Sequence, residues 1–391
     1  MITFTPKEKA IVDKIKELKK ASGSHSPNKL TMLNSIPELS IKVDACFLSN
    51  PYANDLFLEY LNRDIIETGL LKEIIETYPS QNRAIAKPLA GHLRINPENL
   101  FVGNGAIEII QAIIHRFVKG KLLVTLPTFS SYYEFATPET KVVWHYLKKE
   151  NNFKFNTEEF IKTAKNQKAN SVVIINPNNP DGGYIPHSEI LLILKELAGL
   201  DNIIIDESFI HFALEDKTGE IMTATELILK YPNLVVIKSM SKDFGIAGIR
   251  AGYGVMSEAK VATLLQNGYL WNLSGLAEYF FGIYTKPDFS QAYEKIRKDY
   301  IKTTQAFFKE LAAVPGLKTY PSQANFALVE LTNGARAEDA VLKLLISKGI
   351  HLRDCGDKLG LSGEFIRVAS RTVEENKMIV SAFRELFSES N

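Results

Sequence analysis

The chain has 391 residues, of which 45% are hydrophobic and 23% charged, so it is a globular protein too long for one ordinary core. Its formal net charge of +1 favours neither nucleic acid nor an acidic membrane surface as a partner. No apolar run approaches the roughly 20 residues of a membrane span, and the charged stretch Lys7–Lys20 is unlike a signal peptide. The two cysteines, Cys46 and Cys355, form neither a disulfide framework nor a metal-ligand cluster, so we expect a cytoplasmic protein without a metal site.

The first 60 residues predict a helix followed by an irregular arm. Ile11, Ile15 and Leu18 repeat at helical spacing within the first twenty residues, with lysines on the other faces. This pattern favours a solvated helix with one docked stripe over a basic helix that binds a partner. Residues 21–60 are rich in Ser, Asn and Pro, which is typical of an arm. We therefore expect residues 1–60 to join the smaller domain.

Residues 61–285 alternate short β-branched runs with helical stretches. The expected strands are Leu122–Leu126, Val142–Leu147, Ser171–Ile175, Asn202–Ile205, Leu234–Ile237 and Ala251–Val255. The expected helices between them are Ser188–Leu197, Ile221–Tyr231 and Ala259–Leu265. This alternation predicts a large α/β domain with a mostly parallel sheet flanked by helices. Ligands of such sheets bind at the carboxyl ends of the strands.

Residues 286–391 predict a smaller α+β domain. A long charged helix, Gln291–Leu311, precedes three expected strands, and a helix from Glu374 closes the chain. The three strands are Phe326–Leu331, Gly349–Arg353 and Phe365–Ala369.

The most informative segment runs from Ser239 to Tyr253, directly after an expected strand. Lys242 lies there among small hydroxyl residues and glycines, where its amine can form an imine with a cofactor. Ser239, Ser241 and Arg250 are suited to bind a phosphate group. The alternative is a solvated glycine-rich loop.

Two further segments place polar side chains directly after expected strands. Asp206 follows three β-branched residues, where a carboxylate can pair with a cationic ring nitrogen of a cofactor. Taken alone, a helix N-cap is the more frequent role for such a residue. Asn179 lies in the turn Asn176–Gly182, which can direct an amide at a cofactor oxygen or can be a surface turn.

Three weaker signals complete the set. Gly105 and Ala106 begin an expected helix, where backbone amides can bind phosphate. Phe129 follows a strand and can stack on an aromatic ring, although core packing is the commoner role. Arg367 interrupts an apolar strand, which is costly unless it meets an anion such as a substrate carboxylate or a buried acid.

Along the chain, these candidate site residues come in a fixed order. The candidate phosphate loop at Gly105 is followed by the aromatic Phe129, the turn with Asn179, the acid Asp206, Lys242 and Arg367. From about Asn50 to the C-terminus, this order and these residues resemble the fold-type I pyridoxal-5'-phosphate (PLP) enzymes, specifically class I/II aminotransferases. The resemblance implies the PLP-dependent transferase fold and PLP as the cofactor.

The resemblance also implies a role for each matching residue. Lys242 would hold PLP as an imine, Asp206 would pair with its ring nitrogen, Asn179 would contact its phenolic oxygen, and Phe129 would stack on its ring. The phosphate would be held by Gly105, Ala106, Ser239, Ser241 and Arg250. Tyr78 would reach the phosphate in the neighbouring subunit, which implies a homodimer whose sites are completed by the other copy.

Within this family the chain resembles histidinol-phosphate aminotransferase and threonine-phosphate decarboxylase, which both act on phosphorylated amino compounds. Phe209, where the aminotransferases carry tyrosine, and Phe129 as the stacking residue favour the decarboxylase. The surroundings of Arg353, Arg371 and Trp271 favour it too, whereas Ser241–Gly248 is closer to the aminotransferases. The substrate-binding residues implied are Arg353, Arg367, His25 and Asn50.

We therefore expect decarboxylation of a small phosphorylated amino acid, O-phospho-L-serine or O-phospho-L-threonine. The alternative is transamination between glutamate and a phosphorylated substrate. Both anions of the substrate can be bound in either pose, and the pose decides which bond at the α-carbon breaks. A non-catalytic protein of this fold would have lost a site residue, and none is lost here.

Overall fold

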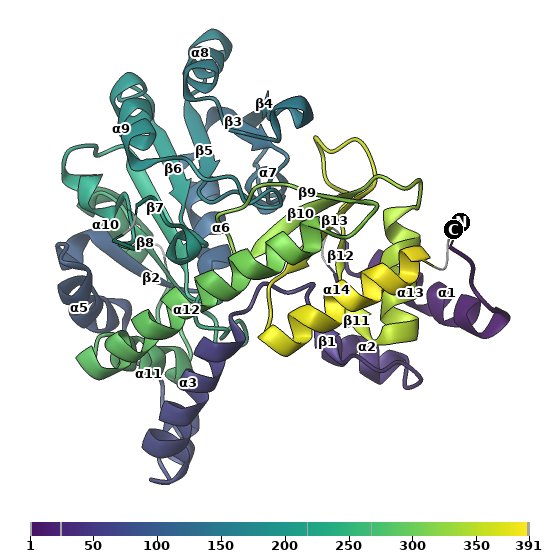
Figure 1. The fold of residues 1–391 in the computed structure, drawn as a ribbon. Coiled ribbons are helices and arrows are strands. Elements are labelled where there is room, and N and C mark those ends of the chain that lie inside the picture. The colour runs from purple at the N-terminus through teal and green to yellow at the C-terminus, as the bar shows by residue number, and fades with distance from the viewer. Residues whose placement is uncertain (1, 24–25, 217, 267, 389–391) are drawn as a thin grey trace. The chain divides into compact units, whose positions relative to one another are not determined.

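The structure is a computed structural model that describes residues 2–23, 26–216, 218–266 and 268–388 (Figure 1). The chain forms two compact units. Unit 1 comprises residues 1–48, 180–182 and 301–391, and unit 2 comprises residues 49–179 and 183–300.

These bounds differ from the expected domain limits at residues 60 and 285. Asn50 donates its backbone N–H to the carbonyl of Lys242, which ties the start of helix α3 (Pro51–Leu61) into unit 2. Helix α12 (Pro287–Ala312) is continuous through Tyr300, the last residue of unit 2. The first boundary therefore lies in the loop before α3, and the second lies inside a helix, where no change of composition marks it.

Unit 2 contains a seven-stranded sheet in the order β2-β8-β7-β6-β5-β3-β4. The strands are β2 (Leu100–Asn104), β3 (Gly120–Leu126), β4 (Thr140–Tyr146), β5 (Ser171–Ile175), β6 (Asn202–Asp206), β7 (Leu234–Ser239) and β8 (Ala251–Val255). Only β8 pairs antiparallel, with β7 on one side and β2 on the other. The expected mostly parallel sheet is confirmed, and β2 is the strand that the sequence pattern did not reveal.

Both faces of this sheet are covered by helices (Figure 1). Successive strand residues enter opposite cores, so that Ile203 and Ile205 pack in one core and Ile204 in the other. The first core includes side chains from α3, α5 (Asn82–Leu93), α8 (Thr157–Gln167), α9 (His187–Glu196) and α11 (Gly275–Tyr284). The second includes side chains from α6 (Ala106–Phe117), α7 (Ser131–Glu134) and α10 (Glu258–Gln266). The remaining short elements are η1 (Asn62–Ile66), α4 (Leu71–Glu76), η2 (Pro97–Asn99), η3 (Lys149–Asn151) and η4 (Ile210–Phe212).

The helix expected over Ile221–Tyr231 is wrong. Only a 3-10 turn, η5 (Thr225–Leu229), forms there. Buried Glu207 accepts hydrogen bonds from the Thr223 hydroxyl and the Ala224 backbone N–H, so the segment is anchored to the end of β6. Tertiary anchoring therefore overrides the local helical pattern.

Unit 1 contains an antiparallel sheet in the order β12-β13-β10-β9 and a separate parallel pair, β1 with β11. The strands are β9 (Leu317–Thr319), β10 (Phe326–Leu331), β12 (Arg353–Asp354), β13 (Phe365–Ala369), β1 (Val43–Asp44) and β11 (Ile350–His351). The single strand expected over Gly349–Arg353 is wrong, because its two halves pair with different partners on either side of Leu352.

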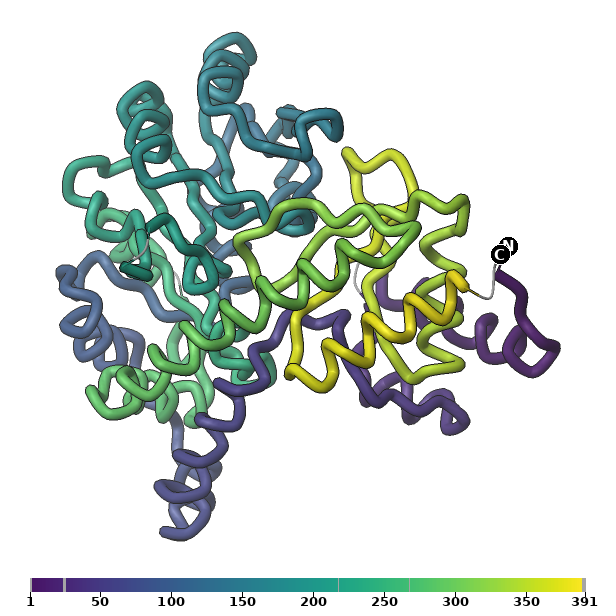
Figure 2. The backbone as a smooth tube through the Cα atoms, in the orientation of Figure 1, coloured from purple at the N-terminus to yellow at the C-terminus, as the bar shows by residue number. Residues whose placement is uncertain are grey.

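The N-terminal segment is part of unit 1 and is more regular than the expected arm. It forms α1 (Pro6–Ala21), α2 (Lys29–Ser35) and β1, and Figure 2 shows this purple segment beside the yellow C-terminal one. Ile11, Val12 and Ile15 of α1 pack with Leu342 and Leu345 of α13 (Ala337–Lys348). The docked stripe is therefore confirmed. Helix α14 (Val373–Ser388) closes the described chain.

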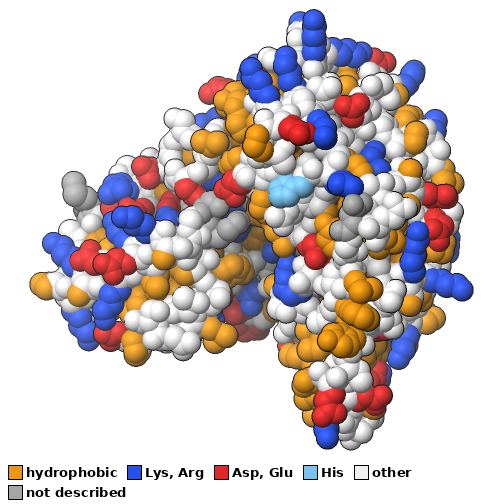
Figure 3. Space-filling view, turned by 180° about the vertical axis from the view of Figure 1, so that it is seen from behind, with side chains coloured by type: hydrophobic (Ala, Val, Ile, Leu, Met, Phe, Trp, Pro, Cys, Tyr) orange, Lys and Arg blue, Asp and Glu red, His pale blue; other side chains and the backbone are white. Residues whose placement is uncertain are grey.

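Two kinds of feature are absent from the described residues. Over that part of the chain, no helix is long and apolar enough to cross a membrane. No group of three or more His, Cys, Asp and Glu side chains within the same residues is arranged to hold a metal ion. On the face in Figure 3, acidic and basic side chains are interspersed, in keeping with the net charge of +1.

Candidate active site

The sequence-predicted residues of unit 2 follow four neighbouring parallel strands at their carboxyl ends. Phe129 follows β3, Asn179 follows β5, Asp206 ends β6, and Lys242 follows β7. Because β3, β5, β6 and β7 are adjacent and parallel, these ends meet at one edge of the sheet. The expected cluster of polar residues therefore forms within one unit.

Asp206 is buried and held by two donors. Its Oδ1 accepts the Ser208 backbone N–H at 2.8 Å, and its Oδ2 accepts the Tyr132 hydroxyl at 2.8 Å. Burial raises the pKa of Asp206, while the hydrogen bonds from Ser208 and Tyr132 lower it. Since β6 leads into the 3-10 turn η4, Asp206 does not cap an α-helix. Tyr132 was missed by sequence reasoning, because nothing in its local pattern indicates a contact 74 residues away.

The lysine loop, residues 239–242, is held in part by two backbone N–H contacts. The Ser241 N–H donates to Ser239 Oγ at 3.3 Å, and the Lys242 carbonyl accepts the Asn50 N–H at 3.0 Å. Asn50 is fully buried, and its Oδ1 caps α3. Its Nδ2 meets no acceptor among the described residues, so this amide can serve an oxygen of a bound molecule.

Glycines of β2 and β8, a serine of β7 and the start of α6 adjoin at one place, which we call the cradle. Strand register places Gly103 opposite Gly252 and Gly252 opposite Ser239. Gly105 has a φ of +76° and precedes the 12-residue helix α6, whose first amides include that of Ala106. A Cβ at Gly105 would collide with the Arg250 guanidinium, so the absence of a side chain keeps Arg250 beside the helix N-terminus. Backbone amides, serine hydroxyls and a guanidinium thus converge, which is the donor set that fits a phosphate.

The ring-facing candidates occupy the same strand ends. Asn179 is buried, and its neighbour Asn178 accepts from the Thr128 hydroxyl at 3.0 Å, which links this turn to the residue preceding Phe129. Phe129 is half-buried and packs against the core beneath α6.

Tyr78 is 78% exposed and stacks on Trp271 with ring centroids 4.8 Å apart.

In unit 1, the two expected substrate arginines are direct cross-strand partners. Arg353 of β12 lies opposite Arg367 of β13, so both side chains project from the same face of the sheet. Arg353 contacts Asp357 at 2.6 Å, and Arg367 Nη2 donates to the Cys46 carbonyl at 2.9 Å. Like charges placed opposite one another are unfavourable unless an anion is near. Asp357 supplies one such anion for Arg353, and the two guanidinium groups can also hold a further anionic group.

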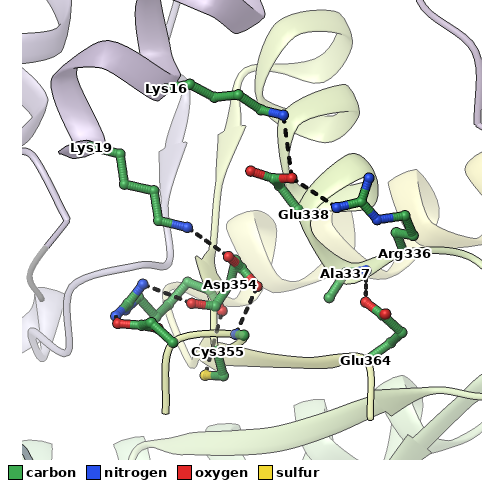
Figure 4. Close-up of polar contacts among 11 residues, drawn as sticks. Lys16, Lys19, Arg336, Ala337, Glu338, Asp354, Cys355 and Glu364 are labelled. Atoms are coloured by element: carbon green, nitrogen blue, oxygen red, sulfur yellow. Dashed lines mark hydrogen bonds and ion pairs between the residues drawn. The ribbon is translucent and has the colours of Figure 1, made fainter.

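Two lysines of α1 form ion pairs within unit 1 (Figure 4). Lys19 binds Asp354, the residue after Arg353, at 2.6 Å, and Lys16 lies 3.3 Å from Glu338. The Gly356 N–H also donates to Asp354, at 3.0 Å. These pairs support the docked helix rather than a basic partner-binding surface. His25, the remaining substrate candidate, lies outside the described residues.

Comparisons with known proteins identify the family. Residues 62–383 match the family model described as aminotransferase class I and II. The chain is 54% identical to an L-serine phosphate decarboxylase of Campylobacter jejuni over 389 residues, covering all of both chains. It belongs to the class I and II aminotransferase family. It is also 43% identical to an L-serine phosphate decarboxylase of Sulfurospirillum multivorans, covering 95% of each chain.

Solved structures of this aminotransferase family share the fold. A decarboxylase from Sulfurospirillum multivorans matches with a TM-score of 0.94 at 41% identity, covering 98% of both chains. The histidinol-phosphate aminotransferase of Clostridium acetobutylicum matches with a TM-score of 0.76 at 28% identity, covering 89% of this chain and 99% of that one. The expected family and its α/β fold are therefore confirmed.

This aminotransferase-family chain has a buried charge cluster in unit 1 that sequence reasoning missed. Asp44 Oδ1 lies 3.1 Å from His351 Nδ1 and also accepts the Cys46 N–H at 3.2 Å. Burial lowers the pKa of His351, but Cys46 and Asp44 outweigh this and raise it to about 10. The three residues meet because β1 pairs with β11, across a sequence separation of 307 residues.

Proposed function

We propose that this protein is a PLP-dependent decarboxylase of a small O-phosphorylated amino acid, with O-phospho-L-serine as the first candidate. The observation that carries the proposal is 54% identity across the whole chain to an L-serine phosphate decarboxylase. Histidinol-phosphate aminotransferases, such as that of Methanococcus aeolicus, are 30% identical over 82% of this chain. The decarboxylase relationship is thus both stronger and more complete.

The residues of unit 2 fit PLP. We assign the covalent attachment to the Lys242 amine and the ring-nitrogen contact to Asp206. Asp206 is fixed for that role by Tyr132 and Ser208. When bound, PLP withdraws the electron pair of the bond that breaks at the substrate α-carbon.

The other cofactor contacts are assigned by position in the cradle and at the strand ends. Phe129 would stack on the ring, and Asn179 would contact the phenolic oxygen. The phosphate would be bound by Gly105, Ala106, Ser239, Ser241 and Arg250. The cradle geometry supports this assignment, because a side chain at Gly105 would displace Arg250.

The substrate carries two anionic groups, and the chain offers two cross-strand arginines. We propose that Arg353 and Arg367 bind the phosphate and the carboxylate, with the buried Asn50 amide and His25 as further contacts. Two guanidinium groups on one face suit a dianionic phosphate and a carboxylate. The positions at which the two anions are bound fix the orientation of the substrate α-carbon. These residues would therefore decide whether CO₂ or a proton is lost from it.

We also propose that the functional unit is a homodimer in which Tyr78 reaches the neighbouring site. The segment from the end of α3 through α4 exposes an apolar set, and Figure 3 shows hydrophobic side chains gathered at the lower end of the view. The exposed large residues of this segment are Leu58, Ile66, Leu70 and Ile75, and the exposed Tyr78 follows shortly after α4. Sedimentation of the pure protein as a monomer at micromolar concentration would contradict this proposal.

Free cysteines support a cytoplasmic location. Cys46 and Cys355 are both buried and unbridged, which is the state that a reducing compartment maintains.

One incubation tests the proposed reaction. Purified protein with PLP is supplied separately with O-phospho-L-serine, O-phospho-L-threonine, and histidinol phosphate plus 2-oxoglutarate. We expect CO₂ and O-phosphoethanolamine from the first, and no product when Lys242 is replaced in Lys242→Ala. Accumulation of a keto product with the aminated form of the cofactor would contradict decarboxylation and favour transamination.

A further inference from the structure

A buried ion pair spans the lysine loop of unit 2. Lys238, the penultimate residue of β7, is 1% exposed and contacts the carboxylate of Asp243, which is 0% exposed. Lys238 Nζ also donates to the Ser239 carbonyl at 3.1 Å. The four residues between the partners are 239–242, which include Ser239, Ser241 and Lys242. The ion pair therefore closes a short loop that contains three proposed cofactor contacts.

Stability alone does not explain this pair. Removing two charges from water costs more than their attraction commonly returns, and apolar residues of similar size are often as stable or better. Asp243 Oδ1 moreover has no hydrogen-bond partner among the described residues. Burial raises the pKa of Asp243, and the Lys238 ammonium lowers it, which leaves it at about 6. Unsatisfied buried groups of this kind occur mainly where function demands them.

His211 connects the pair to the segment that follows Asp206. His211 Nδ1 lies 3.7 Å from Asp243 Oδ2 and 2.9 Å from the Tyr293 hydroxyl. The His211 carbonyl accepts from Arg297 Nη1 at 2.9 Å, and Arg297 is fully buried. Burial, Lys238 and Arg297 all lower the pKa of His211, so the imidazole is neutral at physiological pH. The network thus ties the acid-bearing segment to the lysine-bearing loop.

We propose that Lys238 and Asp243 are positioning residues that hold Ser239, Ser241 and Lys242 in the geometry needed to bind PLP, with His211 coupling this loop to the Asp206 segment. Several short contacts complete the loop, including the Ile246 N–H to the Ser241 carbonyl at 3.1 Å. Without the Lys238–Asp243 ion pair, the backbone next to Lys242 is less constrained. A small shift there would misplace the Lys242 amine. This inference rests on the proposed PLP cofactor and is independent of which reaction follows.

A double variant separates positioning from stability. Lys238→Met/Asp243→Leu replaces the pair by apolar residues of similar volume, so we expect a melting temperature within a few degrees of the wild type. PLP affinity, measured by equilibrium dialysis, should nevertheless weaken at least tenfold. The pH midpoint of the visible absorbance of the lysine-bound cofactor should also move. A double variant with wild-type affinity and midpoint would overturn the inference.

Two further variants complete the test. Lys165→Met/Glu196→Leu removes an exposed ion pair of unit 2, whose atoms lie 2.7 Å apart, and should change neither PLP affinity nor midpoint. If the buried double variant does not fold, Asp243→Glu keeps the charge but lengthens the side chain. It should weaken PLP binding three- to tenfold, and unchanged binding would again overturn the inference. A wild-type protein that binds no PLP overturns the proposed cofactor as well, whereas wild-type binding with an unaffected variant refutes the positioning role alone.

Discussion

Single contacts set the charge of the proposed catalytic residues. Asp206 is buried, which favours its neutral form, yet a carboxylate is needed to pair with a ring nitrogen. The Tyr132 hydroxyl at 2.8 Å and the Ser208 amide favour the ionised form, although burial keeps the pKa of Asp206 above its usual value. We therefore propose that Tyr132 affects the chemistry through Asp206.

The first prediction concerns Tyr132→Phe. Removing the hydroxyl raises the pKa of Asp206, because a hydrogen bond that favours the carboxylate is lost. A hydrogen bond to a charged group contributes about 1.5–3 kcal/mol, so we expect kcat to fall roughly 10- to 100-fold. The acid limb of the pH–rate profile should move to higher pH. Tyr146→Phe, at an exposed tyrosine, is the control, and an unchanged profile for Tyr132→Phe would argue against this role.

The second prediction concerns Arg353→Ala. If Arg353 binds the substrate phosphate, the KM for O-phospho-L-serine should rise about 10- to 100-fold, the effect of one charged hydrogen-bonding group. Turnover of unphosphorylated serine, where measurable, should change little. Arg336→Ala removes an exposed arginine of the same unit and serves as the control. Equal losses for both substrates would show that Arg353 does not select the phosphate.

Residues that follow strands were predictable, and residues that act through other residues were not. Lys242, Asp206 and Asn179 stand out because each follows an apolar run whose end must face a ligand edge. Tyr132 lies in the four-residue helix α7 without a pattern of its own, and His351 meets Asp44 only through a long-range strand pair. Such contacts depend on chain topology, which local periodicity does not encode.

At the scale of elements, the N-terminus of α6 shows how backbone geometry makes a binding site. Gly105 has a left-handed φ of +76°, which side chains rarely adopt, and leaves room for Arg250 beside the first amides of the helix. The helix macrodipole adds favourable potential for an anion there. The sequence motif indicated this cradle only weakly, because glycine before a helix is common.

The third prediction follows from that geometry. Gly105→Ala should displace the Arg250 guanidinium and strain the backbone by about 1 kcal/mol or more, so PLP affinity should fall at least tenfold. Gly91→Ala is the matched control, since a Cβ at Gly91 meets nothing within 4 Å. That change lies inside helix α5 and should leave PLP binding intact while stabilising the protein by up to about 1 kcal/mol. Equal affinity in both variants would contradict the cradle.

Element boundaries were the least predictable part of the fold. The run Gly349–Arg353 has the composition of one strand, yet β11 and β12 belong to different sheets. Helix α3 begins within a region rich in Ser, Asn and Pro, because buried Asn50 caps it and anchors it to the Lys242 carbonyl. The split of Gly349–Arg353 and the start of α3 both depend on partners distant in sequence. The central parallel strands are recognisable because each is a continuous apolar run.

At the scale of the whole molecule, the His351 cluster links stability to pH. The pKa of His351 is raised from 6.5 to about 10, so the native state holds the proton more tightly than the unfolded chain. The part of this stabilisation that comes from Asp44 is complete below about pH 6.5 and is lost as the pH rises toward 10. The charged form of His351 therefore stabilises unit 1 less as the pH becomes alkaline.

The fourth prediction tests this linkage. Urea unfolding of the wild type and His351→Gln is compared at several pH values between 6.5 and 10. The free energy of unfolding of the wild type should exceed that of His351→Gln by the largest amount near pH 6.5. This difference should shrink steadily as the pH rises. His115→Gln, at an exposed histidine, should show no such trend. A margin that is constant with pH would rule out a charged His351.

The cross-strand placement of Arg353 and Arg367 has a consequence for how substrate choice can change. Successive residues of a strand face opposite sides, so shifting β12 by one residue against β13 would turn Arg353 away from Arg367. Insertions in the connection between the strands, residues 355–364, can be absorbed by the loop. An added residue between Leu352 and Arg353 cannot, because β11 holds the chain on the other side. The proposed anion recognition therefore depends on strand alignment as well as on side-chain identity, and an insertion at this point should abolish it.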